Sequence, residues 1–583
     1  MNAATTSGQT VEAALAPVAA GAILSAFDTY QTEYRLITQR SQSRFETRDW
    51  LGANADAVAR LELYPTVIRQ IVADIRSILG DHCRDRAVWR LMKERYTELI
   101  GRRDDIETAE TFFNSVTRRI FATVGVDPQI EYVASEVKGR RSQDTPLLHR
   151  YDGRGGLAPL LRAILADHPF NAPYADLERD VRLAAARIEA SLAERELGGV
   201  DAADVVRHVF YRNKAAYIIA RLHCGDKRVP LALCLLNDER GITIDAVLLT
   251  ADEVSILFSF TRSYFHVEVE SPYELIEFLK SIMPRKPMSE LYTSIGFNKH
   301  GKTELYRELL AHLAHSDSKF EIARGEKGMV MLVFTMPSFD VVFKIIKDRF
   351  AYPKKTTRDG VMERYQLVFK HDKAGRLVDA QEFEHLEFDR ARFTPELVEE
   401  MLAIAANTVT VTDDKVIIKH LYTERRLTPL NIFIKEATGD ALYDAIVDYG
   451  VAIKDLAATN IFPGDLLLKN FGVTRHSRIV FYDYDELCLV TDCRFRALPD
   501  SDDAVDEFRA DLVFYVDEHD IFPEQFEKFL GLPLPQRKIF MAHHRDLLDP
   551  AFWNEMKARH DAGEVMDIFP YKQSQRLHHD RSQ

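Results

Sequence analysis

The segment IFPGDLLLKNFGVTRHSRIVFYDYD, residues 461–485, constrains the fold and the chemistry of this chain more than any other. Asp465 lies five residues before Asn470 and 18 residues before Asp483. The apolar run RIVFY predicts a short β-strand that brings Asp483 and Asp485 to the edge of a site. In this order an Asp can orient an attacking hydroxyl group, and an Asn and a later Asp can hold Mg²⁺ against phosphates. Each residue alone fits a solvated turn equally well, because Asp is common in turns.

The same order of residues occurs in protein kinases, which also need a glycine-rich loop and a strand lysine nearer the N-terminus. Both are present in EIARGEKGMVMLVFTMPSFDVVFKII, where Gly325 and Gly328 lie in a turn between strand-like segments and Lys344 follows in an apolar run. Glycine lets backbone amides approach phosphate oxygens, and a buried strand lysine needs a counter-charge, which phosphate supplies. Lys344 alone could also be a strand lysine whose ammonium reaches water. All four features in order favour a nucleotide site.

Several features depart from an ordinary protein kinase. Pro-Gly-Asp stands in place of His-Arg-Asp, and Asp-Tyr-Asp in place of Asp-Phe-Gly. The loop keeps only G-x-x-G, and Lys469 lies closer to Asn470 than the usual catalytic-loop lysine. Because no Ala-Pro-Glu follows Asp485, the sequence does not predict an activation loop of the common regulated type.

Longer strings resemble one family, the bifunctional isocitrate dehydrogenase kinase/phosphatases of bacteria. The resemblance covers most of the chain and is carried by ARGEKGMVMLVFTMPSFDVVFKIIKD, VDAQEFE, HLYTERRLTPLNIF, NIFPGDLLLKNFGVTRH and VFYDYDE. Members phosphorylate a serine of NADP-dependent isocitrate dehydrogenase with ATP, which inactivates that enzyme and sends isocitrate into the glyoxylate bypass. They also remove the phosphate. The resemblance therefore implies a protein serine kinase and phosphatase, with ATPase activity, that controls the branch point between the citric acid cycle and the glyoxylate bypass.

The resemblance also implies roles for individual residues. It places the nucleotide loop on Ala323, Arg324, Gly325, Glu326, Lys327, Gly328 and Met329. The ATP lysine falls on Lys344, the catalytic-loop Asp on Asp465, and the metal ligands on Asn470 and Asp483. A further active-site Asp, linked more to dephosphorylation, falls on Asp379 within RLVDAQEFE. Without the resemblance, Asp379 would be interpreted as the N-cap of a helix beginning at AQEFEHLEF.

The implied cofactors are ATP and Mg²⁺, with ADP in the reverse reaction and AMP as an allosteric effector. AMP is expected near the contact between an N-terminal regulatory domain and the kinase domain, although the sequence does not locate its residues. Asp465 would orient the substrate serine, and Lys469 could stabilise charge on the moving phosphoryl group. For dephosphorylation the simplest hypothesis is one shared site, where water positioned by Asp379 or Asp465 attacks phosphoserine. A purely structural N-terminal domain that presents the partner enzyme stays an alternative.

The pattern of apolar residues predicts an α+β fold whose N-terminal domain is mainly helical. Residues from about 9 to 125 and from about 176 to 196 have helical spacing. AAYIIARLHCGDKRVPLALCLLN predicts a hairpin with Gly225 and Asp226 near its turn, and strands are expected to continue through VLLTADEVSILFSF. Helices are expected to return in SPYELIEFLKSIM and TELYRELLAHLAH.

The polar break HSDS that follows predicts a domain boundary. At 583 residues the chain exceeds the size of one core, since cores stop growing near about 250–300 residues. We expect a regulatory domain over residues 1–317, with a small antiparallel sheet among its helices. A protein-kinase-like bilobal domain over residues 318–583 should follow, with a β-rich small lobe and a helical large lobe. The last dozen residues, KQSQRLHHDRSQ, predict a frayed polar tail.

Charge and cysteine content restrict the partners and the compartment. A net charge of −14 argues against a general nucleic-acid binder. The five cysteines form no C-x-x-C, which fits a reducing cytosol better than a disulfide framework and predicts no zinc site. The Ala-rich N-terminus contains Glu12 and no basic residue before Arg35, and no uncharged run approaches the length of a membrane span. We expect a cytoplasmic protein; a homodimer is compatible with the sequence, although no coiled-coil pattern supports one.

A second nucleotide-binding pattern, GFNKHGKT from Gly296 to Thr303, matches the P-loop consensus. A P-loop follows a buried apolar strand, whereas the preceding PMSELYTSI is polar and more helical in pattern. We therefore expect a helix N-terminus with an exposed Lys302 and keep a P-loop ATPase as an alternative. A catalytically silent kinase-like binding protein is the other alternative, although such a module has no chemical need to keep Lys344 and the Asp, Asn and Asp of residues 461–485.

Overall fold

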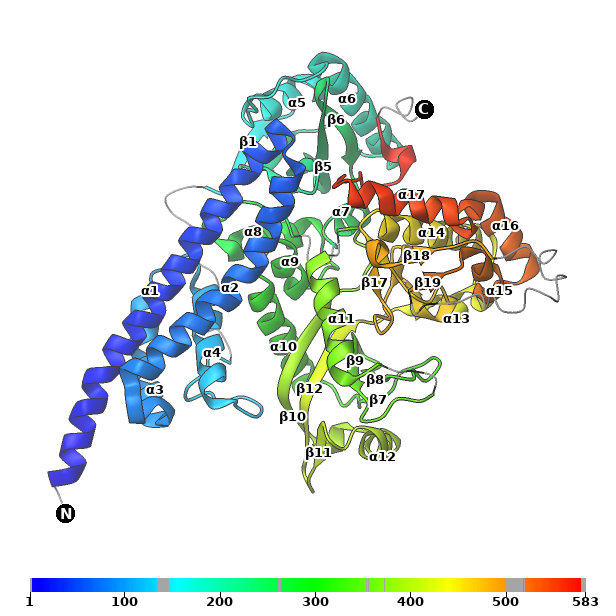
Figure 1. Cartoon of the computed structure of the whole chain (residues 1–583). Coiled ribbons are helices and arrows are strands. Elements are labelled where there is room, and N and C mark those ends of the chain that lie inside the picture. Colours follow the sequence, from blue (N-terminus) through cyan, green and yellow to red (C-terminus); the bar gives the residue numbers. More distant parts are fainter. Residues whose placement is uncertain are drawn as a thin grey trace, which may run out of the picture.

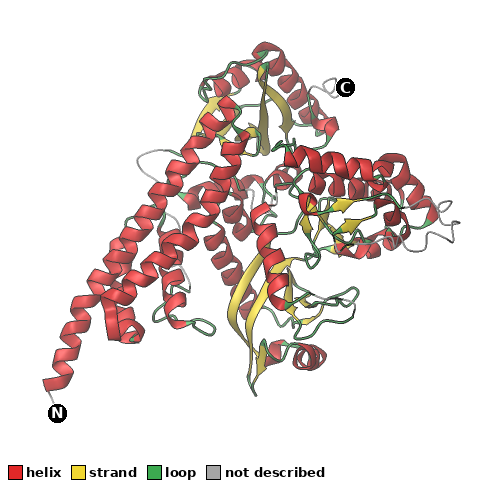
Figure 2. Cartoon of the chain, viewed as in Figure 1, coloured by secondary structure: helices red, strands yellow, loops and turns green. Residues whose placement is uncertain are grey.

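The computed structural model of the chain describes residues 3–133, 146–259, 264–352, 354, 356–371, 373–498, 517 and 519–577. Its N-terminal part consists mainly of helices with one sheet, and its C-terminal part begins with a curled sheet and continues into a helical region (Figure 1). Figure 2 shows that helices predominate and that the strands gather in separate regions of the molecule. The predicted α+β class is confirmed.

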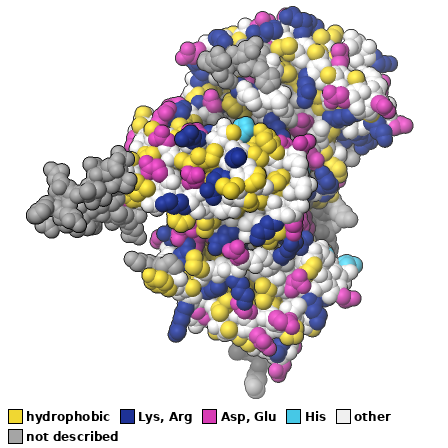
Figure 3. Space-filling model, turned by 90° about the vertical axis from the view of Figure 1, so that its right-hand side faces the viewer, with side chains coloured by type: hydrophobic (Ala, Val, Ile, Leu, Met, Phe, Trp, Pro, Cys, Tyr) yellow, Lys and Arg dark blue, Asp and Glu magenta, His cyan; other side chains and the backbone are white. Residues whose placement is uncertain are grey.

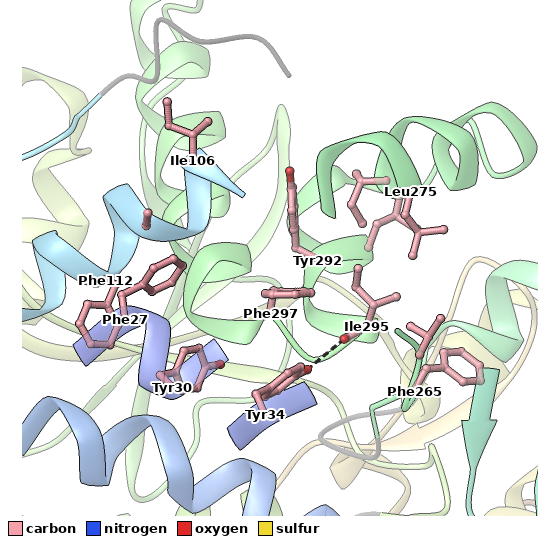
Figure 4. Close-up of a cluster of buried hydrophobic side chains, with 14 of the residues drawn as sticks. Phe27, Tyr30, Tyr34, Ile106, Phe112, Phe265, Leu275, Tyr292, Ile295 and Phe297 are labelled. Carbon is pink, nitrogen blue, oxygen red and sulfur yellow. Dashed lines mark hydrogen bonds between the residues drawn. The ribbon is translucent and has the colours of Figure 1, made fainter. Parts of the chain in front are cut away.

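Four long helices open the chain, as the spacing of their apolar residues predicts. They are α1 (Ala3–Thr47), α2 (Trp50–Leu79), α3 (Arg86–Ile100) and α4 (Ile106–Phe121), with a short 3-10 turn, η1 (Gly80–Arg84), after α2. The rings of Phe27 and Tyr30 in α1 lie 5.4 and 6.2 Å from the ring of Phe112 in α4 (Figure 4). Tyr34 donates a hydrogen bond to the Ile295 carbonyl at 3.3 Å. The aromatic stripe of α1 therefore fixes the helical bundle to the segment that precedes the C-terminal part.

One stretch, Ala13–Thr47, is long and apolar enough by length and composition to be a candidate membrane span. About a third of its most apolar window, 33%, is buried inside the fold. Ala20, Ile23 and Phe27 belong to the same core cluster as Phe112. A core helix passes the same compositional test, so this stretch is weak support for a span.

The N-terminal sheet is antiparallel, with strand order β1-β2-β4-β5-β6 and β3 paired to β4. Its strands are β1 (Leu148–Asp152), β2 (Ala202–Val206), β3 (Phe210–Arg212), β4 (Ala215–Cys224), β5 (Lys227–Asp238) and β6 (Gly241–Leu248). Helices α5 (Leu157–Ala166) and α6 (Leu177–Glu194) pack against it around one apolar core. The predicted hairpin is β4–β5, and Gly225 adopts φ of 55° at its turn. Residues that carry a Cβ rarely adopt that conformation.

The expectation that strands continue through VLLTADEVSILFSF is wrong beyond Leu248. Helix α7 (Ala251–Leu257) occupies that place. The Thr250 hydroxyl accepts from the Glu253 amide at 3.0 Å, and the Glu253 carboxylate accepts from the Thr250 amide at 2.9 Å. This capping box starts a helix in a sequence whose apolar content alone favours a strand.

Helices α8 (Pro272–Ile282), α9 (Met288–Ser294) and α10 (Asn298–His315) lead to the C-terminal part. The P-loop alternative is not favoured, because the element before Gly296 is the helix α9 and Gly301 lies inside α10. The expected exposure of Lys302 is wrong. Its ammonium lies 4.8 Å from the centre of the Phe383 ring, and burial lowers its pKa to about 7.

The small lobe of the C-terminal part contains a sheet with order β10-β12-β9-β8-β7 and β11 paired to β12. Its strands are β7 (Glu321–Ile322), β8 (Met331–Met336), β9 (Phe339–Ile346), β10 (Ala380–Asp389), β11 (Val409–Val411) and β12 (Lys415–Arg425). Helices α11 (Arg358–His371) and α12 (Pro395–Ile404) accompany them, with the 3-10 turn η2 (Arg390–Arg392). The predicted β-rich lobe is therefore present.

The interpretation of Asp379 as a helix N-cap is wrong. AQEFEHLEFD forms β10, which pairs antiparallel with β12 from Ala380, opposite Glu424, to Asp389. Phe383 and Phe388 of this strand are buried in the small-lobe core. Pairing along the whole strand and burial of its aromatic residues outweigh the helical propensity of the glutamates.

The large lobe is built around α14 (Gly439–Ala457), whose buried face joins the core of this lobe. One short strand, β13 (Thr428–Pro429), precedes α14. Further short strands lie in the segment from residue 461 onward: β14 (Ile461–Phe462), β15 (Phe471–Val473), β16 (Ile479–Phe481), β17 (Cys488–Leu489), β18 (Arg494–Phe495) and β19 (Asp520–Ile521). The remaining helices are α13 (Leu430–Glu436), α15 (Phe526–Phe529), α16 (Leu534–His544) and α17 (Pro550–Asp561), with 3-10 turns η3 (Leu468–Asn470), η4 (Val490–Asp492), η6 (Pro523–Gln525), η7 (Arg545–Leu548) and η8 (Gln573–Gln575).

The end of the chain returns to the N-terminal sheet. Arg576 lies 2.8 Å from the Asp245 carboxylate on β6, and the Tyr571 hydroxyl donates to the same carboxylate at 2.8 Å. The predicted frayed tail is therefore wrong for residues 572–577, and residues 578–583 lie outside the described part. Figure 3 shows acidic and basic side chains mixed over one face of the molecule, with apolar side chains gathered at the level of the large lobe.

Candidate active site

Lys344 lies on β9 in the middle of the small-lobe sheet, between Val333 of β8 and Tyr422 of β12. Its side chain is 7% exposed, and its ammonium lies 2.7 Å from the Glu424 carboxylate. The same ammonium donates to the Tyr482 carbonyl at 2.8 Å. A buried lysine needs a counter-charge. The protein supplies one itself, so Lys344 is held in place before any phosphate arrives.

The predicted nucleotide loop connects β7 to β8 and reaches across to the large lobe. The Glu326 carboxylate lies 3.5 Å from the Lys469 ammonium and accepts from the Asn431 amide at 3.3 Å. The Gly328 carbonyl accepts from the Lys347 ammonium at 2.6 Å. These contacts hold an exposed loop over the boundary of the two lobes.

The other residues of the loop make contacts that fix its two ends. The Ala323 amide donates to β8 at 3.0 Å. Arg324 pairs with a glutamate of α13, and Lys327 lies 2.9 Å from a glutamate of α12. Met329 packs against the large-lobe core. The two basic side chains of the loop are thus engaged by carboxylates, which leaves its backbone amides as the groups suited to phosphate.

Asp465 follows a turn that only glycine can make. Gly464 has φ of 76°, and a Cβ there would lie 2.5 Å from the Glu486 carbonyl oxygen. Pro-Gly-Asp therefore lets the catalytic loop touch the segment after Asp483. Burial raises the pKa of Asp465, the charges of Glu486 and Asp485 raise it further, and Lys354 opposes them.

Tyr482 joins three of the predicted site residues. Its amide donates to the Asn470 carbonyl at 3.0 Å, its hydroxyl donates to the Lys469 carbonyl, and its own carbonyl accepts from Lys344. The adjacent residues, Phe471 of β15 and Phe481 of β16, begin the antiparallel pairing of these two strands. The strand pairing therefore places Asp483, the residue after Tyr482, beside the Asn470 segment and near the Lys344 ammonium.

One predicted metal ligand, Asp483, is half-buried and lies beside the buried Asp485. Burial raises the pKa of Asp483, and the neighbouring Asp485 carboxylate raises it further. Asp485 lies 3.0 Å from the Lys354 ammonium, and Asn470 is 4% exposed. Mg²⁺ prefers one or two carboxylates and completes its shell with water and substrate phosphates. The carboxylates of Asp483 and Asp485 repel each other at the end of a strand, and the Asn470 side chain is buried in the adjoining segment. A divalent cation would relieve that repulsion.

Asp379 lies just before β10 and accepts a hydrogen bond from the Gln381 amide at 2.7 Å. Its charge raises the pKa of Glu424, whose carboxylate is buried, so the two carboxylates are neighbours. Asp379 and Glu424 both line the cavity between the N-terminal part and the small lobe. The structure therefore brings Asp379 to the Lys344–Glu424 pair from the side of the N-terminal part.

Two cavities meet at Arg425, the residue that follows Glu424. One, of about 490 Å³, follows the connection from β12 to α13 and is lined by Ala323 and Arg324 of the nucleotide loop. The other, of about 310 Å³, lies between the two parts of the chain and includes Lys286 and Glu290. The walls that they share are Asp340, Arg425, Leu427, Thr474 and Arg475.

Sequence reasoning missed Glu424, Lys354 and Glu486. Glu424 has a usable signal, since it interrupts the apolar strand KVIIKHLYTER, and a buried glutamate on a strand calls for a cationic partner. Lys354 gives no such signal in the sequence. Its partners Asp485 and Glu486 lie 131 and 132 residues further along the chain, and nothing local indicates that they meet. The sequence predicts Asp485 at the edge of the site but assigns it no role.

The arrangement suits phosphoryl transfer. A buried ammonium, exposed loop amides, and oxygen ligands at a strand end are the groups that such a reaction uses. The half-buried Asp465 carboxylate lies where a hydroxyl could approach from solvent.

Two family models together match nearly the whole chain. Residues 20–317 match the model described as isocitrate dehydrogenase kinase/phosphatase (AceK), regulatory domain, and residues 318–573 match the model of the kinase domain of the same family. An isocitrate dehydrogenase kinase/phosphatase of Anaeromyxobacter sp. (strain Fw109-5) is 50% identical over 566 residues, which are 97% of this chain and 98% of the relative. One of Xanthomonas campestris pv. campestris (strain 8004) is 42% identical over 559 residues, 95% of this chain and 96% of the relative.

Proposed function

This chain belongs to the isocitrate dehydrogenase kinase/phosphatase family, and we propose from that premise that it transfers phosphate from ATP to a serine of isocitrate dehydrogenase and removes it again. The observation that carries the proposal is the buried Lys344–Glu424 pair beside the strand that ends in Asp483. A silent binding module has no need for a buried charged pair at that place, since burying charges costs several kcal/mol. We also propose that the target is the NADP-dependent form of the dehydrogenase and that the phosphorylated residue is a serine.

For the kinase reaction, ATP lies between the lobes with its base in the 490 Å³ cavity and its phosphates under the glycine loop. Lys344 would neutralise the α- and β-phosphate oxygens, and Asn470 and Asp483 would hold Mg²⁺, which would supply positive charge to the phosphates. Asp465 accepts a hydrogen bond from the serine hydroxyl and orients it for in-line attack. Lys469 stabilises charge on the phosphoryl group as it moves.

For dephosphorylation we propose the same site with ADP retained. Water attacks phosphorus and the bond from phosphorus to the serine oxygen breaks. One proton of the water ends on the serine oxygen, and the water oxygen leaves as part of inorganic phosphate. Asp379 positions that water. The support is its place beside Glu424, where a carboxylate that accepts from Gln381 can also accept a proton from water approaching through the interdomain cavity.

We infer that AMP binds in the 310 Å³ interdomain cavity. Arg285, Lys286 and Arg475 offer positive charge to its phosphate, and Ile256 and Phe258 offer apolar surface to its base. Arg425 lies 3.2 Å from Glu290 and lines both cavities, so a ligand in one changes a wall of the other. That shared wall is the physical route by which AMP would change ATP chemistry.

We place the boundary between the regulatory and kinase domains after residue 317. The support is that α10 ends at His315 and the first strand of the small lobe begins at Glu321. A cytoplasmic location is proposed on the five cysteines, each of which is free in the structure.

The test uses purified protein, MgATP labelled at the γ-phosphate, and isocitrate dehydrogenase from the same cell. Incorporation of label with loss of dehydrogenase activity, absent in Asp465→Ala, is the expected result. If the protein hydrolysed ATP but the dehydrogenase carried no label, the nucleotide site would be supported and isocitrate dehydrogenase would be ruled out as the substrate. Label incorporation that persists in Asp465→Ala would remove the assigned role of that residue.

A further inference from the structure

A third cavity, of about 630 Å³, lies where β9 leads into α11 and has strongly basic walls. Its basic residues are Lys347, Arg349, Lys354, Arg358 and Lys419. The acidic residue of its wall is Asp348, whose carboxylate accepts from the Asn407 amide at 3.0 Å. Lys354 is already paired with Asp485 and Glu486. Among the described residues of the wall, the other four positive charges face the one negative charge of Asp348 and repel each other unless an anion or solvent compensates them.

Three of these cations are held toward the cavity by uncharged groups. The Lys347 ammonium donates to the Gly328 carbonyl at 2.6 Å, and the Lys419 ammonium donates to the Asn407 carbonyl at 3.0 Å. Arg358 donates to the Thr408 hydroxyl at 3.1 Å. Among the described residues, no carboxylate oxygen lies within 4.0 Å of any of the three. Carbonyls and hydroxyls position these groups without neutralising them.

The start of α11 adds to the positive potential. The helix has 14 residues and begins at Arg358, and the Thr357 hydroxyl accepts from the Gly360 amide at 3.1 Å. Amides in the first turn of a helix point outward and favour negative charge. Arg358 thus sits at the positive end of a helix and among lysines, an arrangement that suits a tetrahedral, multiply charged anion because a guanidinium can donate two parallel hydrogen bonds to one.

The cavity touches the active site at two points. Lys354 lies 3.0 Å from Asp485 and also pairs with Glu486, the residue whose carbonyl meets Gly464. Lys347 holds the Gly328 carbonyl of the nucleotide loop. An anion in the cavity would compete with Asp485 and Glu486 for Lys354, and with Gly328 for Lys347.

We propose that this cavity is a binding site for a phosphate group, either free inorganic phosphate or the phosphomonoester of a small metabolite. We propose further that its occupancy changes the balance of the two reactions by drawing Lys354 and Lys347 away from the active site. The binding half stands on the cavity alone, and the coupling half rests on the proposed function.

The first experiment measures binding of inorganic phosphate and of glycerol 2-phosphate to the full chain by calorimetry, without metal or nucleotide and at constant ionic strength. Lys419→Gln should weaken binding about tenfold, because each contact to a charged group contributes that much. Lys415→Gln is the matched control, since it lies on the same strand but pairs with Asp389 at 2.8 Å. Tighter binding of one probe identifies the source of the phosphate group.

Unchanged binding in Lys419→Gln and in Arg358→Gln, both folded by circular dichroism, would overturn the site. Equal weakening in Lys415→Gln would overturn it too, because general charge would then explain the binding.

The second experiment follows kinase and phosphatase rates with and without phosphate. A change in their ratio for the native chain, lost in Lys419→Gln, supports the coupling. Binding without any change in ratio overturns the coupling alone, and absence of both activities would count against the proposed function while leaving the calorimetry valid.

Discussion

The Lys344 ammonium lies 2.7 Å from the Glu424 carboxylate, and the two residues come from neighbouring strands, β9 and β12. In most protein kinases the strand lysine pairs with a glutamate of a helix, which can swing away and inactivate the enzyme. A strand partner in the same sheet has no such freedom. The lysine is therefore fixed whether or not nucleotide is present, and control must act elsewhere, such as the walls shared by the two central cavities.

Replacing Lys344 should abolish ATP turnover, whereas replacing Lys302 should not. Lys344→Met removes the positive charge beside the phosphates, and losing one such group costs about 100- to 1,000-fold in rate. Lys302→Met removes an ammonium that lies over the Phe383 ring, outside the proposed nucleotide site. Labelled-ATP hydrolysis by both variants checks this. A larger loss in Lys302→Met would return the P-loop to consideration.

Gly464→Ala should damage both stability and catalysis. The substitution places a Cβ at a φ of 76° and 2.5 Å from the Glu486 carbonyl oxygen. The left-handed conformation alone costs about 1–2 kcal/mol, and the close approach forces the loop of Asp465 to move. Thermal unfolding and kinase rate together measure the effect.

Gly198→Ala is the matched control for that variant, because a Cβ at Gly198 meets nothing within 4 Å. We expect its melting temperature to stay within about 1–2 °C of the native value, as for surface changes of under about 0.5 kcal/mol. A Gly464→Ala variant as stable and active as Gly198→Ala would show that the turn before Asp465 tolerates a side chain.

The sequence predicts most of the residues of the proposed site. Asp465, Asn470 and Asp483 are close in sequence, and the apolar run RIVFY between them predicts one strand, β16. The sequence does not predict its partner β15, and the pairing of these two short strands brings the segments of Asn470 and Asp483 together. Lys344 could be found because a lysine inside the apolar run VVFKII needs a counter-charge when the strand is buried. Tyr482 contacts Asn470 and Lys344 through its backbone amide and carbonyl, which any residue could supply, so the sequence gives no signal for these two contacts.

The errors have physical causes of the same kind. Residues 380–389 form a strand because the whole length of β12 is available to pair with them, which local propensity does not reveal. Residues after Leu248 form a helix because of two hydrogen bonds between Thr250 and Glu253. The C-terminal residues are ordered because the Arg576 guanidinium donates to the Asp245 carboxylate, which lies 331 residues earlier in the sequence.

Asp379→Asn should impair dephosphorylation more than phosphorylation. The variant keeps the shape of the side chain and its contact with Gln381 but removes the negative charge that would accept a proton from water. Loss of a general base costs about 100- to 10,000-fold, so we expect phosphatase activity to fall by that factor and kinase activity by less than about tenfold. Release of phosphate from the labelled dehydrogenase, beside its incorporation, measures both rates.

Gln381→Leu is the accompanying control, because it removes the donor to Asp379 and keeps the carboxylate. A smaller loss of phosphatase activity is expected for it than for Asp379→Asn. If Asp379→Asn lowered both activities equally, the carboxylate would serve the Lys344–Glu424 pair and have no special part in dephosphorylation.

AMP affinity should fall as the pH rises through about 8. Lys286 is fully buried in the interdomain cavity, 3.1 Å from Glu290, and burial lowers its pKa to about 8 from 10.5. Glu290 opposes that shift, whereas Arg425 and Arg475 add to it. Since a phosphate with a second pKa near about 6 is already doubly charged above neutrality, the change would come from the protein. Between pH 7 and 9 the dissociation constant of AMP should rise about tenfold.

Lys286 affects the stability of the fold in the opposite direction to its effect on AMP affinity, so the two effects can be told apart. Because the pKa of Lys286 is lower in the folded chain than in the unfolded chain, the unfolded state binds more protons between about pH 8 and 10.5. The contribution of this group to the free energy of unfolding therefore rises with pH in that window, so weaker AMP binding there cannot come from a loss of fold caused by Lys286. Calorimetric titration of AMP at pH 7, 8 and 9, with Lys286→Met as the control, measures the effect. An AMP affinity that does not change with pH, or that is the same in Lys286→Met, would show that this ammonium does not hold the nucleotide.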